Sequence, residues 1–150
     1  GLRYGKICIL ADADSDGLHI ATLLCALFLQ HYKPLVQQGR IYVSMPPLYR
    51  IDCAKEVFYA LDDAQRETIV KDLKSRKGKL KINIQRFKGL GEMNPPQLRE
   101  TVMDPATRQL VNLTISPNDN AHSVMDLLLA KKRAPDRKEW LEKKGSLVKV

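Results

Sequence analysis

The sequence predicts an α/β fold in which a parallel β-sheet is flanked by helices and followed by a helical C-terminal tail. The apolar runs at residues 7–10 and 41–45 have the length and composition of buried strands, and a helical pattern lies between them. A strand, a helix and a strand in this order almost always form a right-handed crossover with parallel strands. Residues 6–45 therefore predict one βαβ unit.

The crossover is expected to contain a helix from His19 to His31. Pro34 is expected to break this helix or to start a second short turn, which Gly39 ends as a C-terminal stop. Apolar positions at helical spacing are expected to face the core. They are Ile20, Leu23, Leu24, Leu27, Phe28 and His31.

Short strands and one helix are expected in the middle of the chain. Pro46 and Pro47 end the crossover, and the following apolar runs are short and separated by turn residues. The expected elements are strands at 48–51 and 56–60, a helix capped by Asp62 or Asp63 that runs to about Lys74, and an alternating strand at 81–87.

The last third of the chain is expected to change from a sheet to helices. Asn94 followed by Pro95 is typical of a helix start, with the cap residue preceding a proline in the first turn. A strand at 109–115, a helix at 116–130 and a charged helical tail follow. We therefore expect two units, a core at residues 1–117 and a tail at 118–150.

The net charge of +8 is concentrated in the second half of the chain. Residues 1–75 contain nine Lys/Arg and nine Asp/Glu, so the excess of cations lies in residues 76–150. Such a surface favours a polyanion, usually nucleic acid, although a solvated basic face is the simpler alternative. The three cysteines are expected to be free thiols in a reducing compartment. No apolar run has the length needed to span a bilayer, so no membrane partner is expected.

Three carboxylates at alternate positions, Asp12, Asp14 and Asp16, precede Gly17 on the turn between the first strand and the first helix. Ligands bind at the carboxyl ends of strands in open α/β sheets. Mg²⁺ takes one or two carboxylates together with waters and substrate phosphates. These three residues are therefore candidate metal ligands. The simpler alternative is that Asp16 only caps the helix that begins near Leu18.

A calcium-binding EF-hand also begins with this D-x-D-x-D-G pattern, but two observations exclude it. The twelfth loop position, where a bidentate Glu belongs, is Leu23, and the loop follows a strand-like run instead of a helix.

A second candidate site is the segment from Lys88 to Met93. Gly89 and Gly91 allow the backbone to approach a ligand closely, and the flanking cations suit a phosphate. This pattern does not match a dinucleotide-binding glycine motif, and two glycines alone are weak evidence.

Three segments together resemble a known family. Residues 12–20, 46–50 and 85–95 are similar to the successive signatures of the Toprim region in B subunits of bacterial type IIA topoisomerases. The chain ending, at 128–133, 136–137 and 140–142, is more similar to the topoisomerase IV branch than to the gyrase branch. The chain also lacks the large insertion that many gyrases carry between residues 50 and 85.

The resemblance implies a Toprim fold, with a Rossmann-like parallel sheet, and a place in a cytoplasmic, ATP-dependent enzyme that cleaves, religates and decatenates DNA. It implies a heterotetramer with an A subunit, whose tyrosine attacks the phosphodiester. Mg²⁺, for which Mn²⁺ or Ca²⁺ can substitute, would be held by Asp12, Asp14 and Asp16. The residues expected near DNA are Arg86, Lys88, Gly89, Gly91 and His19, although a lone histidine is more often structural. The resemblance also implies that Gly89 and Gly91 let their loop pack against the turn that carries the three acids.

The sequence departs from the family pattern in one respect. The family's E-G-D motif, whose Glu is the first metal ligand and candidate general acid-base, does not precede Gly1. We therefore expect a fragment without this strand and without the ATP-binding domains. No complete catalytic set is expected in this chain, and the fragment alone is expected to be inactive.

Three alternatives remain open. The chain can belong to the B subunit of a gyrase. It can belong to another Toprim enzyme, such as a primase or nuclease, which should lack the motif at 85–93. It can also be a non-catalytic Toprim-like DNA-binding module, whose DNA binding would survive loss of the acidic residues.

Overall fold

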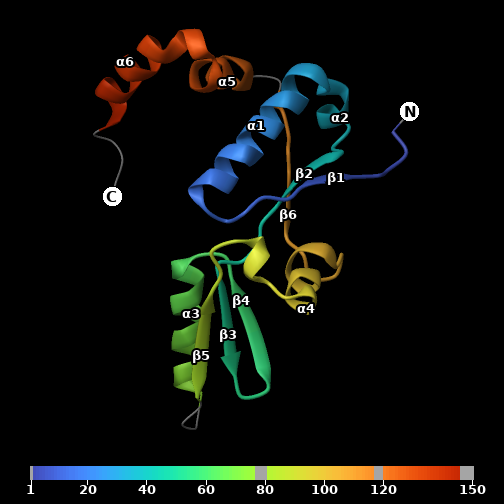
Figure 1. Cartoon of the computed structure of the whole chain (residues 1–150), viewed down its shortest axis with the longest axis vertical. Coiled ribbons are helices and arrows are strands. Elements are labelled where there is room, and N and C mark those ends of the chain that lie inside the picture. The colour runs from blue at the N-terminus through green and yellow to red at the C-terminus, as the bar shows by residue number, and fades with distance from the viewer. Residues whose placement is uncertain (1, 77–80, 117–119, 146–150) are drawn as a thin grey trace.

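The computed structural model describes residues 2–76, 81–116 and 120–145. Figure 1 shows two lobes stacked along the long axis of the molecule and an arm of helices that projects from one of them. We call residues 6–45 with 109–116 the crossover lobe, residues 48–87 the hairpin lobe and residues 120–145 the arm. The expected α/β class is confirmed.

The crossover lobe contains the expected βαβ unit and one further strand. Strand β1 pairs in parallel with β2, with Ile7 opposite Ile41, and β6 pairs antiparallel with the other edge of β2. The elements are β1 (Ile7–Ile9), α1 (Ser15–His31), α2 (Lys33–Gln37), β2 (Ile41–Ser44) and β6 (Leu110–Asn112). Pro34 lies in the first turn of α2, and Gly39 has a φ of 65°, as a glycine that stops a helix allows.

The expectation of one parallel sheet is wrong for the described residues. They form two three-stranded sheets, in which β1 and β2 make the single parallel pair. Strands β3 (Tyr49–Cys53) and β4 (Glu56–Ala60) are joined by a short hairpin, which makes them antiparallel. Strand β5 (Ile82–Arg86) follows helix α3 (Asp63–Ser75) and pairs antiparallel with β3, and β6 pairs antiparallel with β2.

Helix α1 differs from the prediction at its start and on its buried face. It begins at Ser15, four residues before His19. The buried positions include Ala21, Cys25 and Leu29, which lie one turn apart and pack with Ile9 in the crossover core. Most residues that were predicted to face the core are exposed. Phe28 is the exception and is half-buried against the core. The exposed residues are Ile20, Leu23, Leu24, Leu27 and His31.

The hairpin lobe is an antiparallel sheet covered by one helix. Strand β3 lies between β4 and β5, and Ile51 and Leu73 are buried at the centre of this lobe's own hydrophobic cluster. Ile69 and Val70 of the covering helix also pack against this cluster. The elements are β3 (Tyr49–Cys53), β4 (Glu56–Ala60), α3 (Asp63–Ser75) and β5 (Ile82–Arg86).

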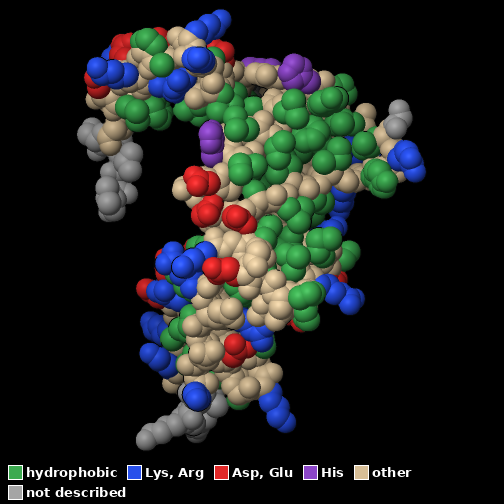
Figure 2. Space-filling model, viewed as in Figure 1, with side chains coloured by type: hydrophobic (Ala, Val, Ile, Leu, Met, Phe, Trp, Pro, Cys, Tyr) green, Lys and Arg blue, Asp and Glu red, His purple; other side chains and the backbone are tan. Residues whose placement is uncertain are grey.

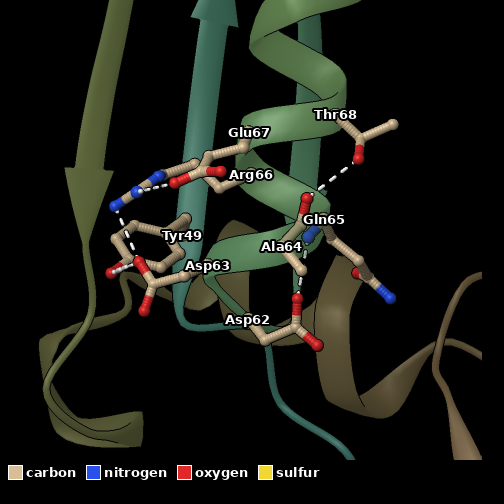
Figure 3. A network of polar contacts seen from close by, with 8 residues as sticks. All are labelled: Tyr49, Asp62, Asp63, Ala64, Gln65, Arg66, Glu67 and Thr68. Carbon is tan, nitrogen blue, oxygen red and sulfur yellow. Dashed lines mark hydrogen bonds and ion pairs between the residues drawn. The ribbon is translucent and has the colours of Figure 1, made fainter.

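The start of α3 is fixed by polar contacts, which Figure 3 shows. Asp62 is the N-cap and accepts the Gln65 backbone N–H at 2.8 Å. The Tyr49 hydroxyl donates to Asp63 at 2.9 Å, and Arg66 pairs with the same carboxylate at 2.8 Å while its guanidinium lies over the Tyr49 ring. Strand β3 and helix α3 are thereby held together at one end of the lobe.

Residues 88–108 connect β5 to β6 through short helical turns. As expected, Asn94 and Pro95 begin a helix, and Asn94 forms a reciprocal capping box with Gln97. The elements are η1 (Leu90–Glu92), α4 (Pro95–Leu98) and a π-helical turn η2 (Arg99–Met103).

The arm consists of α5 (Ala121–Leu129), a short turn η3 (Lys131–Arg133) and α6 (Ala134–Lys144). Arg137 donates to the carbonyls of Leu127 and Ala130 and so caps the C-terminal end of α5. Met125 packs against the crossover core. The large apolar residues of α6, Trp140 and Leu141, are 41% and 58% exposed.

Some expectations fall outside the described residues. They are the proposed boundary at residue 117 and the end of the tail at 146–150. Among the described helices, none has the length and apolar character required to cross a membrane.

Candidate metal and nucleic-acid site

The acidic turn, residues 12–17, joins β1 to α1. Asp14 is the N-cap of α1, and its Oδ1 accepts the Gly17 backbone N–H at 2.8 Å. Asp16 lies in the first helical turn, where a negative charge interacts favourably with the helix dipole. The cap expected at Asp16 is therefore made by Asp14, which explains the earlier start of the helix.

Gly17 allows the turn to fold back on itself. A Cβ atom at this position would lie 2.0 Å from the backbone oxygen of Asp12 and 2.7 Å from its carbonyl carbon. No side chain fits there, because these atoms belong to the backbone and cannot rotate away. The glycine of the motif therefore packs the first turn of α1 directly on Asp12.

Asp12 reaches out of the acidic turn to the segment that follows β5. Its Oδ1 accepts the backbone N–H of Leu90 at 2.7 Å, across a sequence separation of 78 residues. A Cβ at Gly89 would lie 3.0 Å from each of the three carboxylate atoms of Asp12. The two motifs that were selected separately in the sequence thus meet at one place.

We call residues 88–92 the glycine loop. Phe87 precedes it, is 2% exposed and donates its N–H to the Leu48 carbonyl, which anchors the loop to the hairpin lobe. The Lys88 N–H donates to Glu92 Oε2 at 2.8 Å and closes the loop. A Cβ at Gly91 would meet nothing within 4 Å, so the close approach to Asp12 is made at Gly89 and not at Gly91.

The charged side chains of both motifs are exposed. Arg86 ends β5, Lys88 begins the glycine loop, and both are exposed. His19 is also exposed, one turn into α1 from Ser15. Figure 2 shows acidic side chains gathered where the lobes meet and basic side chains next to them on the hairpin lobe.

The acidic turn fits part of a divalent-cation site. One oxygen of Asp12 and one of Asp14 accept backbone N–H groups, so the second oxygen of each carboxylate is available to a cation. Within residues 2–76, 81–116 and 120–145, no group of three or more His, Cys, Asp or Glu side chains is arranged to hold a metal. Two carboxylates are nevertheless enough for Mg²⁺, because this cation takes waters and phosphate oxygens as its other ligands.

Sequence reasoning missed two participants in this arrangement. One is the Leu90 N–H, a backbone donor that no residue type reveals. The other is Glu92, whose side chain closes the glycine loop. Its position four residues after Lys88 is the one signal that could have indicated this contact.

A cavity of about 250 Å³ lies away from the acidic turn, between the hairpin lobe and the π-helical turn. The Tyr59 hydroxyl donates to Glu100 at 2.9 Å in its wall. Its lining residues are Met45, Pro47, Val57, Tyr59, Leu61, Glu100, Thr101, Thr107 and Gln109.

Burial and the hydrogen bond to Glu100 raise the pKa of Tyr59 to about 12. Because the folded state favours the neutral phenol, this stabilisation is complete below pH 10 and is lost as the pH rises from 10 to 12. We expect absorbance at 295 nm to detect a phenolate transition near pH 12 that Tyr59→Phe lacks. The variant should also unfold with a weaker pH dependence in this range, and an equal dependence would contradict the assignment.

The chain is homologous to the B subunits of type II topoisomerases. Residues 79–142 match the family described as DNA gyrase B subunit, carboxyl terminus. The chain is 64% identical over 149 residues to the B subunit of DNA topoisomerase 4 from Pseudomonas aeruginosa and 62% identical over 151 residues to that from Escherichia coli. Each match covers 99% of this chain and 24% of the relative. The B subunit of DNA gyrase from Thermotoga maritima is 43% identical over 148 residues, which are 99% of this chain and 22% of that protein.

A solved structure resembles the fold. The crystal structure of the Plasmodium falciparum topoisomerase II DNA-binding, cleavage and re-ligation domain matches with a TM-score of 0.73 and 26% identity. The match covers 94% of this chain and 19% of that chain. The present chain thus spans about a quarter of the length of the curated relatives and a fifth of the solved chain. Its homology to the topoisomerase IV relatives lies in the C-terminal region of their B subunits.

Proposed function

We propose that this chain is the metal-binding Toprim part of the B subunit of topoisomerase IV and supports double-strand cleavage and religation of DNA. The observation that carries the proposal is the hydrogen bond from Leu90 to Asp12, which brings the acidic turn and the glycine loop together. Carboxylates that suit a divalent cation and exposed cations that suit a phosphate thus occupy one surface.

The acidic residues and the basic residues have different roles on this surface. Asp12 and Asp14 hold Mg²⁺ through the oxygens that backbone N–H groups leave available, and Asp16 adds negative charge beside them. When bound, the cation stabilises negative charge on the scissile phosphate and on the leaving oxygen. Arg86 and Lys88 bind the DNA backbone next to this position, and His19 contacts the same strand from the start of α1.

The nucleophile belongs to a partner in this proposal. A tyrosine of the A subunit attacks the phosphodiester, and two copies of each subunit form the heterotetramer, which acts in the bacterial cytoplasm. The relatives from topoisomerase 4, at 62–66% identity, support this assignment over gyrase. Gyrase remains the second candidate because a gyrase relative is 43% identical over nearly the whole chain.

The proposal is tested with the longer B subunit that contains this segment, mixed with its A subunit, ATP and Mg²⁺. We expect the complex to separate interlinked DNA circles and to relax supercoils. Introduction of negative supercoils into relaxed DNA would identify gyrase instead. DNA binding without any change of linking number would support the non-catalytic module.

A further inference from the structure

The contact between the acidic turn and the glycine loop is made by a single carboxylate oxygen and a backbone donor. Asp12 Oδ1 lies 2.7 Å from the Leu90 nitrogen, within the range of a charge-assisted hydrogen bond. The Gly89 backbone lies against the same carboxylate, where a Cβ would be 3.0 Å from its atoms. The side chain of Asp12 therefore forms the surface on which the loop rests.

The glycine loop owes its own shape to other contacts. Glu92 accepts the Lys88 N–H, and the Glu92 N–H donates to the Gly89 carbonyl at 3.2 Å. Buried Phe87 fixes the point where the loop leaves the hairpin lobe. Because none of these contacts involves Asp12, the loop can keep its internal shape while it separates from the acidic turn.

We propose that Asp12 is a positioning residue that docks the glycine loop on the acidic turn. Its Oδ1 holds the loop, and its Oδ2 remains available to a cation. Docking fixes the side chain of Asp12 in one orientation and places Lys88 beside the acidic turn. The importance of this placement for DNA rests on the proposed function, whereas docking itself does not.

Amide hydrogen exchange of the full chain, without DNA or metal, tests the docking. Three amide protons separate the possible events: Leu90 reports docking, Lys88 reports loop closure, and Phe87 reports pairing in the hairpin lobe. We expect Asp12→Ala to accelerate Leu90 exchange by about tenfold to a hundredfold, the value for a hydrogen bond to a charged group, with Lys88 and Phe87 unchanged.

Two further variants separate packing from charge. Gly89→Ala keeps Asp12 but places a Cβ 3.0 Å from its carboxylate, which must then shift by a few tenths of an ångström, so Leu90 should exchange faster than in the wild type. Asp12→Asn retains an acceptor oxygen of the same shape, so Leu90 should stay protected to within a few-fold. Asp16→Ala removes a neighbouring acid that is absent from this contact and serves as the matched control.

Unchanged Leu90 exchange in both Asp12→Ala and Gly89→Ala would overturn the proposal. Equal acceleration at Leu90, Lys88 and Phe87 would also overturn it, because Asp12 would then stabilise the chain as a whole. The outcome is separable from the proposed function. If Asp12→Asn keeps the Leu90 amide protected and cleaves DNA normally, the docking stands and the proposed metal role of Asp12 is wrong. If Asp12→Asn exposes the Leu90 amide and does not cleave DNA, the docking is wrong and the metal role stands.

Discussion

Gly17→Ala is expected to destabilise the protein by about 3 kcal/mol, at the upper end of the usual cost of overpacking. Alanine normally stabilises a helix relative to glycine by about 0.5–1 kcal/mol, so the expected sign is the reverse of the helix propensity. The reason is that the new Cβ would lie 2.0 Å from the Asp12 backbone oxygen. Relief requires a backbone shift that also disturbs the cap made by Asp14.

Urea unfolding of the full chain measures this effect. Gly91→Ala is the matched control, because its Cβ would meet nothing within 4 Å, and its free energy of unfolding should change by no more than about 0.5 kcal/mol. If Gly17→Ala were as stable as the wild type, the first turn of α1 would not pack on Asp12.

Asp12→Asn and Asp14→Asn are each expected to reduce DNA cleavage by about a hundredfold or more in the reconstituted complex. Each substitution removes the charge that would hold the cation, and loss of electrostatic stabilisation in a transition state typically costs this much. Both variants keep an oxygen that accepts the present hydrogen bond. Asparagine is also as good an N-cap as aspartate, so α1 should retain its stability.

Asp62→Asn provides the matched control, because Asp62 caps α3 as Asp14 caps α1 but lies on the hairpin lobe. Cleavage by this variant should equal that of the wild type. Covalent complexes between DNA and the A subunit are the readout, with DNA binding measured in parallel. Binding should persist or tighten in the acidic-turn variants, because metal-free carboxylates repel phosphates. Unchanged cleavage would assign the turn a structural role and favour the binding module.

Signals encoded in local sequence predicted much of the fold. The cap at Asp62, the capping residue Asn94 with Pro95, and the stop at Gly39 each lie where expected. The buried face of helix α1 was harder to predict, because the helix has apolar residues on every side. Leu23 and Leu27 are larger than Ala21 and Cys25, yet the smaller pair faces the sheet. Hydrophobicity identifies what can be buried, while the approach of β1 and β2 decides which face is buried.

The residue types predicted two separate motifs, and only the family resemblance implied that the glycine loop packs on the acidic turn; the contact that joins them was not predicted. Alternating acids and paired glycines are visible in the residue types, but the donor that joins them is the N–H of Leu90. Every residue other than proline carries such a group, so the sequence contains no mark of it. The same limit applies to the antiparallel return of β6, because the pairing partner of a strand depends on the whole chain.

The position of the hairpin lobe between β2 and β6 has a consequence for folding kinetics. Paired residues of that lobe are at most 37 positions apart in the chain, as Tyr49 and Arg86 are, whereas Val43 in β2 and Val111 in β6 are 68 positions apart. Closing a long flexible loop costs entropy, and a prefolded insertion shortens the chain that must be ordered. The hairpin lobe is therefore expected to fold first and to bring the ends of the crossover sheet together, so its stability sets the rate at which the molecule closes.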